Sequence, residues 1–316
     1  MSMPVDAPLV VLLMGPTASG KTAAACRLVD RFDCEIVSVD SALVYRGLDI
    51  GTAKPTPGLL AKYPHHLLDL CDPSDSYSAA QFRTDALKAI DGILHRGRLP
   101  LLVGGTGLYF RVLEEGIAEL PQGDPAIRRR LEDESEKTNL ASMHARLAAV
   151  DPDSAQRIHP HDTQRTLRAL EVYELSGQPM SKLLRQTKLP PPPFSIVKLV
   201  LAPHDRAWLH DRIAQRFRAM LAAGFINEVG ALRDRGDLSL DQPALRAVGY
   251  RAIWRYLEGE YQFEEMVEQG IIATRQLAKR QFTWFRGISD AEWLDSCAAD
   301  IENQLAVALK RHIKVK

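Results

Sequence analysis

The sequence lacks an excess of charge of either sign, because 40 lysine and arginine residues balance 40 aspartate and glutamate residues. A neutral chain gives no overall sign of a nucleic-acid or membrane partner, so such a surface must come from local clustering of charge. No apolar run approaches the roughly 20 residues that a membrane span needs. The apolar run at 9–14 follows Asp6 and has no basic stretch before it. We therefore expect a buried strand there and not a signal peptide.

Cysteine is also scarce. The four cysteines are scattered and include no C-x-x-C pair, which favours reduced thiols over a disulfide framework. The hydrophobic content of 46% and the charged content of 25% are ordinary for a globular enzyme. We expect a cytoplasmic protein with no membrane partner, and 316 residues suffice for one large domain or two modest ones.

A phosphate-binding loop is present in full. Residues 15–22 read GPTASGKT, which matches G-x-x-x-x-G-K-[ST]; an apolar run precedes them and a helical pattern at 22–29 follows. In such a loop the backbone N–H groups point into one concavity, the lysine (Lys21) neutralises phosphate oxygens, and the hydroxyl of Thr22 ligates Mg²⁺. The motif therefore predicts a phosphorylated ligand, without saying whether it is a nucleotide.

Further apolar runs predict strands at 35–40, 99–103 and 194–201. Helical patterns separate the first three strands, which is typical of an α/β fold: a P-loop-type three-layer core with a central parallel sheet. Ligands bind such sheets outside the carboxyl ends of the strands. We therefore expect Asp40 and the glycine-rich turn at 104–107 to lie on the same rim as the phosphate loop.

The middle of the chain differs in character. Residues 122–192 contain helical patterns and no strand candidate, and they end in a run of prolines at 190–193. We therefore predict a first part of the α/β core in residues 1–121, an all-helical insertion domain at 122–192, and completion of the core in residues 193–316. The last part should contain one strand and C-terminal helices at 205–223, 227–235, 243–257 and 263–285.

Asp40 bears on the chemistry. The strand at 99–103 ends in Gly104, without the carboxylate through which a P-loop ATPase or GTPase helps to hold magnesium. Asp40 ends another strand, where it could bind magnesium, accept a proton from a substrate, or simply cap a turn. Together with the loop it indicates group transfer from a phosphorylated donor. A small-molecule or nucleoside kinase using ATP fits these features, and so does a nucleotide-regulated RNA-binding module.

Longer motifs narrow the choice. They occupy residues 38–55, 102–109, 157–172, 248–251 and 274–286. Across about residues 10–295 the sequence closely resembles the bacterial-type tRNA dimethylallyltransferases, the tRNA isopentenyltransferase family. The resemblance implies transfer of a dimethylallyl group from dimethylallyl diphosphate to N6 of the adenosine 3′-adjacent to the anticodon, with release of diphosphate. It further implies a monomer that binds the tRNA anticodon stem-loop, and a phosphate loop that binds the prenyl diphosphate and not a nucleoside triphosphate.

The resemblance also implies roles for individual residues. Asp40 is the general base, Lys21 and Thr22 are catalytic, and Thr22 helps to hold Mg²⁺. The residues implied to bind the diphosphate are Gly15, Pro16, Thr17, Ala18, Ser19, Gly20, Lys21 and Thr22. The residues implied to bind tRNA are Asp40, Ser41, Ala42, Leu43, Thr106, Arg128, Gln164, Arg165, Thr166, Leu167, Arg168, Arg246, Ala247, Val248, Gly249, Tyr250, Arg251, Lys279, Arg280, Gln281, Phe282, Thr283, Trp284, Phe285 and Arg286.

Local charge agrees with an RNA partner. Residues 274–286 contain four basic residues and no acid, interleaved with aromatic residues, which suits phosphates and stacked bases. Arg165 and Arg168 are three positions apart, so both can lie on one helix face. Each stretch taken alone also fits a solvated helix surface.

Overall fold

The computed structural model describes residues 7–118, 120–186 and 192–313. The chain divides into two compact units, Met1–Glu114 with Pro192–Lys316, and Glu115–Pro191. Within the described ranges, no helix combines the length and the apolar character needed to cross a lipid bilayer.

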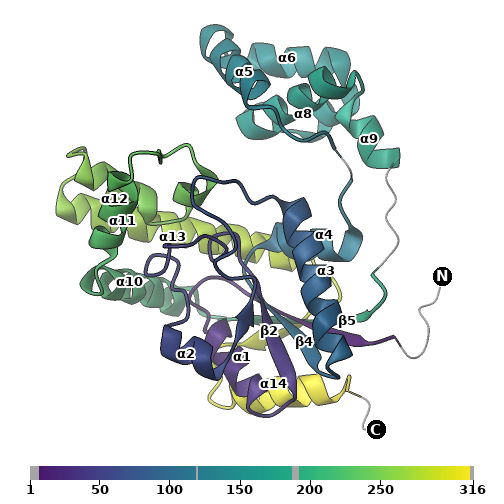
Figure 1. The fold of residues 1–316 in the computed structure, drawn as a ribbon, viewed down its shortest axis with the longest axis vertical. Coiled ribbons are helices and arrows are strands. Elements are labelled where there is room, and N and C mark those ends of the chain that lie inside the picture. Colours follow the sequence, from purple (N-terminus) through teal and green to yellow (C-terminus); the bar gives the residue numbers. More distant parts are fainter. Residues whose placement is uncertain (1–6, 119, 187–191, 314–316) are drawn as a thin grey trace. The chain divides into compact units, whose positions relative to one another are not determined.

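A six-stranded sheet in the order β3-β2-β4-β1-β5-β6 forms the centre of the first unit, and all neighbouring strands run parallel (Figure 1). Its central strands are continuous apolar runs because helices cover both faces. The strands are β1 (Leu9–Met14), β2 (Cys34–Val39), β3 (His65–His66), β4 (Leu99–Gly104), β5 (Ser195–Ala202) and β6 (Glu292–Asp295). This sheet confirms the predicted α/β fold class.

Helices make up the rest of the regular structure described in the first unit. They are α1 (Lys21–Val29), α2 (Pro57–Lys62), α3 (Ala79–His95), α4 (Gly107–Glu115), α10 (Arg206–Ala222), α11 (Phe225–Asp234), the 3₁₀ helix η1 (Pro243–Arg246), α12 (Tyr250–Leu257), α13 (Phe263–Arg286) and α14 (Ile301–Lys310). On one face, α1 and α14 bury apolar side chains against the central strands. The chain moves outward from β1 to β2 through α1 and back to β4 through α3. Right-handed crossovers therefore place α3 on the opposite face.

Some elements differ from the sequence-based expectations. Residues 292–295 form β6, which pairs with β5 at the sheet edge, so the C-terminal part contributes a second strand where one was predicted. The two residues of β3 were also not anticipated; both strands are too short for a periodic pattern to reveal. The single helix expected at 243–257 is interrupted between η1 and α12, because Gly249 has φ +92°, outside the helical region.

The second unit is helical throughout its regular structure. It contains α5 (Pro125–Thr138), α6 (Leu140–Val150), α7 (Pro152–Arg157), α8 (Thr163–Ser176) and α9 (Met180–Gln186). Leu131, Met143, Leu147 and Leu170 form the centre of its own apolar core. Aspartate or asparagine side chains cap the first turns of α5, α6, α7 and α8, which fixes where these helices begin. The predicted proline connector lies partly outside the described residues.

Candidate active site

The loop between β1 and α1 has the backbone of an anion-binding turn. Gly15 has φ +155°, and a Cβ there would lie 2.1 Å from the carbonyl oxygen of Leu201, so only glycine fits. Ala18 and Gly20 also adopt positive φ, at +63° and +93°. No side chain caps the first turn of α1, which leaves its N–H groups for a ligand.

Side chains from two distant helices hold this loop in shape. The Oε1 atom of Gln281 accepts the N–H of Thr17 at 2.8 Å, and its Nε2 atom donates to the carbonyl of Gly105 at 3.0 Å. Arg212 donates from Nε to the carbonyl of Ala18 at 3.1 Å. Gln281 was expected among the tRNA contacts; in the structure it joins the phosphate loop to the end of β4.

Positive charge is concentrated beside the loop. Burial, with the neighbouring guanidinium of Arg216, lowers the pKa of Lys21 to about 7, and Asp40 opposes this shift. Burial also lowers the pKa of Arg216; Asp40 opposes that effect and Arg212 adds to it. The Lys21 ammonium donates to the carbonyl of Pro16 at 2.6 Å. A bound polyanion would favour the charged form of Lys21, because an opposite charge nearby raises the pKa of a lysine.

Two hydroxyl groups of the loop suit a phosphate oxygen or a cation. Ser19 is buried, and its Oγ atom has no hydrogen-bond partner in the part of the chain that the structure describes, which is unusual for a buried polar atom. Thr22 lies in the first turn of α1 and lines the same cavity as Asp40. Hydroxyl and carboxylate oxygens suit Mg²⁺, which is commonly completed by substrate phosphates and water. These residues therefore fit the expected cation.

Asp40 directly follows β2, on the rim that also carries the phosphate loop. Its Oδ1 atom accepts the N–H groups of Ala42 at 2.8 Å and Leu43 at 3.4 Å. The N–H of Ser41 donates to Oγ1 of Thr106, just beyond β4, at 3.1 Å. The structure thus places the ends of β1, β2 and β4 together, with the Asp40 carboxylate lining the same cavity as the half-buried Lys21 and Arg216.

These groups line one cavity of about 1310 Å³. Apolar side chains contribute to its wall, among them Leu108, Leu277 and the half-exposed Trp284. Gly107 leaves room for that indole, since a Cβ there would lie 2.8 Å from it. The volume exceeds the usual range for a single small ligand, so a diphosphate donor and part of a second substrate can enter together.

The remaining tRNA candidates of the first unit are divided between wall and core. Arg246, Ala247, Val248 and Arg280 line the cavity. Tyr250 and Phe285 are fully buried, and the Tyr250 hydroxyl donates to Glu228 at 2.6 Å. Gly249 is buried just before α12. The remaining candidates are exposed or half-buried residues of α12 and α13, namely Arg251, Lys279, Phe282, Thr283 and Arg286.

In the second unit, the candidates on α8 are also of two kinds. Gln164 and Arg165 are exposed, whereas Thr166 and Leu167 are buried in the helical core. Arg168 donates to the buried carboxylate of Glu171 at 2.6 Å, and Arg128 donates to the same carboxylate at 3.2 Å. Arg128 and Arg168 are therefore oriented by an ion-pair network.

Sequence reasoning did not select two residues that the structure places at the loop. Arg212 and Arg216 belong to α10 and line the cavity. Their i, i+4 spacing puts both on one helix face, which was a readable signal. The ligand that this helix face contacts depends on how α10 packs against a loop that lies almost 200 residues earlier in the chain.

Comparisons with known proteins agree with this geometry. The family model described as IPP transferase matches residues 43–288. The tRNA isopentenylpyrophosphate transferase of Bacillus halodurans is 37% identical, with a TM-score of 0.69 and coverage of 97% of this chain and 98% of that one. The tRNA delta(2)-isopentenylpyrophosphate transferase of Staphylococcus epidermidis is 32% identical, with a TM-score of 0.69 and coverage of 97% and 100%.

A eukaryotic dimethylallyltransferase, whose structure was solved acting on tRNA, has a TM-score of 0.80. It is 26% identical, and the match covers 96% of this chain and 79% of that chain. The resemblance seen in the sequence is confirmed over nearly the whole chain, and with it the expectation of a prenyl-transferring enzyme. The chain belongs to the IPP transferase family, the enzymes that prenylate tRNA.

Proposed function

We propose that this enzyme transfers the dimethylallyl group of dimethylallyl diphosphate to the exocyclic N6 amine of the adenosine 3′-adjacent to the anticodon, and releases diphosphate. The observation that carries the proposal is the meeting of Lys21 and Arg216 with Asp40 in one cavity. The half-buried cations suit a leaving anion, and the carboxylate suits a proton acceptor.

The donor end of the reaction requires charge stabilisation. As the bond between the prenyl carbon and the diphosphate oxygen breaks, negative charge grows on the diphosphate. Free N–H groups at the start of α1, the ammonium of Lys21 and the guanidinium of Arg216, which line the same cavity, would stabilise that charge. Thr22 would hold Mg²⁺, which when bound would supply further positive charge to stabilise the leaving diphosphate.

The acceptor end requires a base. The N6 amine is a weak nucleophile because its lone pair is delocalised into the adenine ring. As nitrogen bonds to the prenyl carbon, it must lose a proton, and Asp40, which lines the cavity, would accept it. An adenosine in a single-stranded loop leaves its stack at low cost, and apolar wall residues such as Leu108 and Trp284 would exclude water from the developing allylic cation.

Family membership does not favour the ATP-dependent kinase. A second observation agrees: β4 ends in Gly104, without a carboxylate for a nucleotide-bound magnesium. A binding module without chemistry would not need a carboxylate in the same cavity as these cations. We place the reaction in the cytoplasm.

The decisive experiment supplies the enzyme with Mg²⁺, radiolabelled dimethylallyl diphosphate and an unmodified tRNA carrying adenosine next to the anticodon. Label should enter the tRNA, and digestion should recover it on N6 of that nucleoside. A tRNA with guanosine at the same position is the matched control and should stay unlabelled. Consumption of ATP on a small acceptor, with no label in the tRNA, would refute the proposal.

A further inference from the structure

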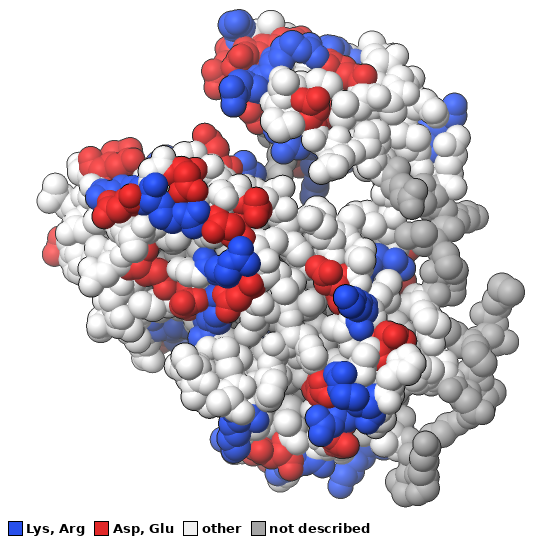
Figure 2. Space-filling view, in the orientation of Figure 1, with Lys and Arg blue, Asp and Glu red and all other residues white. Residues whose placement is uncertain are grey.

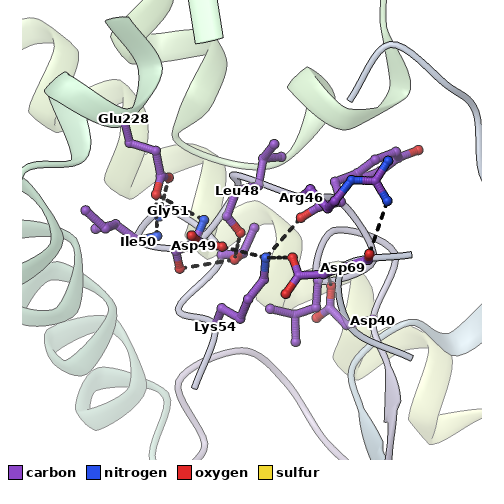
Figure 3. Close-up of polar contacts among 12 residues, drawn as sticks. Asp40, Arg46, Leu48, Asp49, Ile50, Gly51, Lys54, Asp69 and Glu228 are labelled. Atoms are coloured by element: carbon purple, nitrogen blue, oxygen red, sulfur yellow. Dashed lines mark hydrogen bonds and ion pairs between the residues drawn. The ribbon is translucent and has the colours of Figure 1, made fainter. Parts of the chain in front are cut away.

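Lys54 is a buried cation that the proposed chemistry does not use directly. Its side chain is only 5% exposed, yet it lies on the cavity wall between two acids (Figure 3). Its Nζ atom donates to Oδ1 of Asp49 and to Oδ1 of Asp69, each at 2.5 Å, and to the carbonyl of Tyr45 at 3.0 Å. All three donors of the ammonium are thus used within the protein.

The segments that Lys54 joins are held in unfavourable backbone conformations. Ala53 has φ +52°, Leu67 has φ +65° and Asp69 has φ +55°. Such angles are rare for residues other than glycine, and they persist only where the surroundings enforce them, often at functional sites. Ala53 and Asp69 line the same cavity as the phosphate loop. The buried ammonium ties these two segments together, and Arg46 adds to the connection by donating to the carbonyls of Asp69 and Leu70 at 3.3 and 3.0 Å.

Hydrogen bonds lead from Lys54 to the proposed base. Lys54 donates to the carbonyl of Tyr45; the N–H of Tyr45 donates to the carbonyl of Ala42 at 3.2 Å; and the N–H of Ala42 donates to Oδ1 of Asp40 at 2.8 Å. The N–H of Asp69 also donates to the carbonyl of Leu43 at 3.2 Å. The turn that orients the Asp40 carboxylate is therefore held on two sides.

The far end of this loop is anchored to α11. Glu228 accepts the N–H groups of Asp49 and Ile50 on Oε2, at 3.0 and 2.6 Å, and that of Gly51 on Oε1 at 3.1 Å (Figure 3). Gly51 is in close contact with Phe225, since a Cβ there would lie 2.1 Å from that ring. The loop thus provides a rigid support for Lys54.

We propose that Lys54 is a positioning residue: its ammonium bridges Asp49, Asp69 and the Tyr45 carbonyl, and so holds Asp40 in the orientation that accepts the N6 proton. The inference rests on the proposed function, because it assigns Asp40 the role of base. It adds a residue that acts on the reaction through another side chain, because the three donors of its ammonium are already used within the protein.

A mutant cycle tests the role. Lys54→Met keeps the length of the side chain and removes the charge. It should lower kcat for prenyl transfer by about tenfold to a hundredfold, as misplacement of a catalytic group does, with KM for both substrates within about twofold. In an Asp40→Ala background the same change should cost less than about twofold, because two residues that act as a unit are not additive. Lys54→Arg should recover part of the loss.

The experiment distinguishes failure of the positioning role from failure of the proposed function. Equal losses in both backgrounds, or a raised KM for the diphosphate with kcat unchanged, would overturn the positioning role while wild-type transfer upholds the proposed function. Absence of transfer by the wild type would instead refute the proposed function, and the positioning role with it. If Lys54→Met melts early, Asp69→Asn, which alters a carboxylate that is 44% exposed, should show the same non-additivity on a smaller scale. Lys62→Met, at an exposed lysine of α2, should be without effect.

Discussion

At the scale of single residues, a substitution of Asp40 should affect the chemical step and not the binding of tRNA. Asp40→Ala removes the proton acceptor and leaves the loop cations in place. It should lower kcat by about 10²-fold or more, as loss of a general base does, while tRNA affinity changes little. Single-turnover transfer and a filter-binding titration with the same tRNA measure the two quantities. Weakened tRNA binding with normal turnover would contradict the role of Asp40 as base.

Arg216 should contribute to binding of the prenyl donor, dimethylallyl diphosphate. Arg216 is half-buried beside Lys21, and a hydrogen bond to a charged group is worth about 1.5–3 kcal/mol. Arg216→Gln should therefore raise KM for dimethylallyl diphosphate by about tenfold or more and leave tRNA affinity unchanged. Steady-state kinetics at saturating tRNA measure this. The control is Arg218→Gln, at an exposed position of the same helix; an equal effect of both changes would show that Arg216 acts only through overall charge.

At the scale of elements, the carboxylate of Glu35 in β2 links neighbouring segments at one edge of the sheet. Its carboxylate accepts from Arg96 at 2.7 and 2.8 Å and from Arg98 at 3.3 Å, and lies 2.8 Å from Nε2 of His66 in β3. These contacts, the hydrogen bond from Arg96 foremost, lower the pKa of Glu35 to about 2 even though burial opposes the shift. The carboxylate thus connects β2, β3 and the segment between α3 and β4.

The sign of the pH dependence follows from this lowered pKa. The unfolded chain binds the proton of Glu35 near pH 4.5 and the folded chain only near pH 2, so the stabilisation is complete above pH 4.5 and is lost as the pH falls toward 2. Glu35→Gln should lower the free energy of unfolding on the order of 2 kcal/mol at pH 7, and by less at pH 3.5. Urea unfolding at both pH values measures the difference; a deficit independent of pH would mean that the charge is not responsible.

The elements also show what a sequence can reveal. β1, β2, β4 and β5 were predicted within a residue or so of their ends, because fully buried parallel strands are continuous apolar runs between turn residues. β6 was missed because an edge strand of four residues has neither the length nor the buried faces that create such a run. The break before α12 was missed because Gly249 reads as a tolerated helical glycine until its φ is known.

The candidate site likewise contains residues that the sequence predicted and contacts that it did not. The phosphate loop and Asp40 were readable, because a local motif and a strand end carry them. The contact of Gln281 with Thr17 spans 264 residues of chain, and the contact of Arg212 with Ala18 spans 194. Such contacts depend on how α10 and α13 pack against the sheet. Sequence spacing contains no record of that packing, so these roles could be found only in the structure.

At the scale of the whole molecule, the net charge is zero, and both signs are intermingled on the face seen in Figure 2. Lysine and arginine side chains lie among aspartates and glutamates over the face shown in Figure 2, with large uncharged areas between them. Many of the cations are already paired, as Arg168 and Arg128 are with Glu171. A neutral surface of this kind gives weak non-specific attraction to RNA. Affinity for tRNA should therefore depend on a few exposed cations.

Arg165 tests that expectation. Its side chain is 73% exposed on α8, and its ion pair with Asp162 at 3.3 Å is a surface pair of small energetic value. If its guanidinium contacts a tRNA phosphate, Arg165→Ala should weaken binding and make the slope of log K against log salt shallower by roughly 0.7 to 0.9. Titrations of tRNA across a salt series measure both effects. Lys182→Ala, at an exposed residue of α9, should change neither. Because each phosphate contact releases about one counterion, an unchanged slope for Arg165→Ala would assign Arg165 to the structure of α8 and leave tRNA binding to other cations.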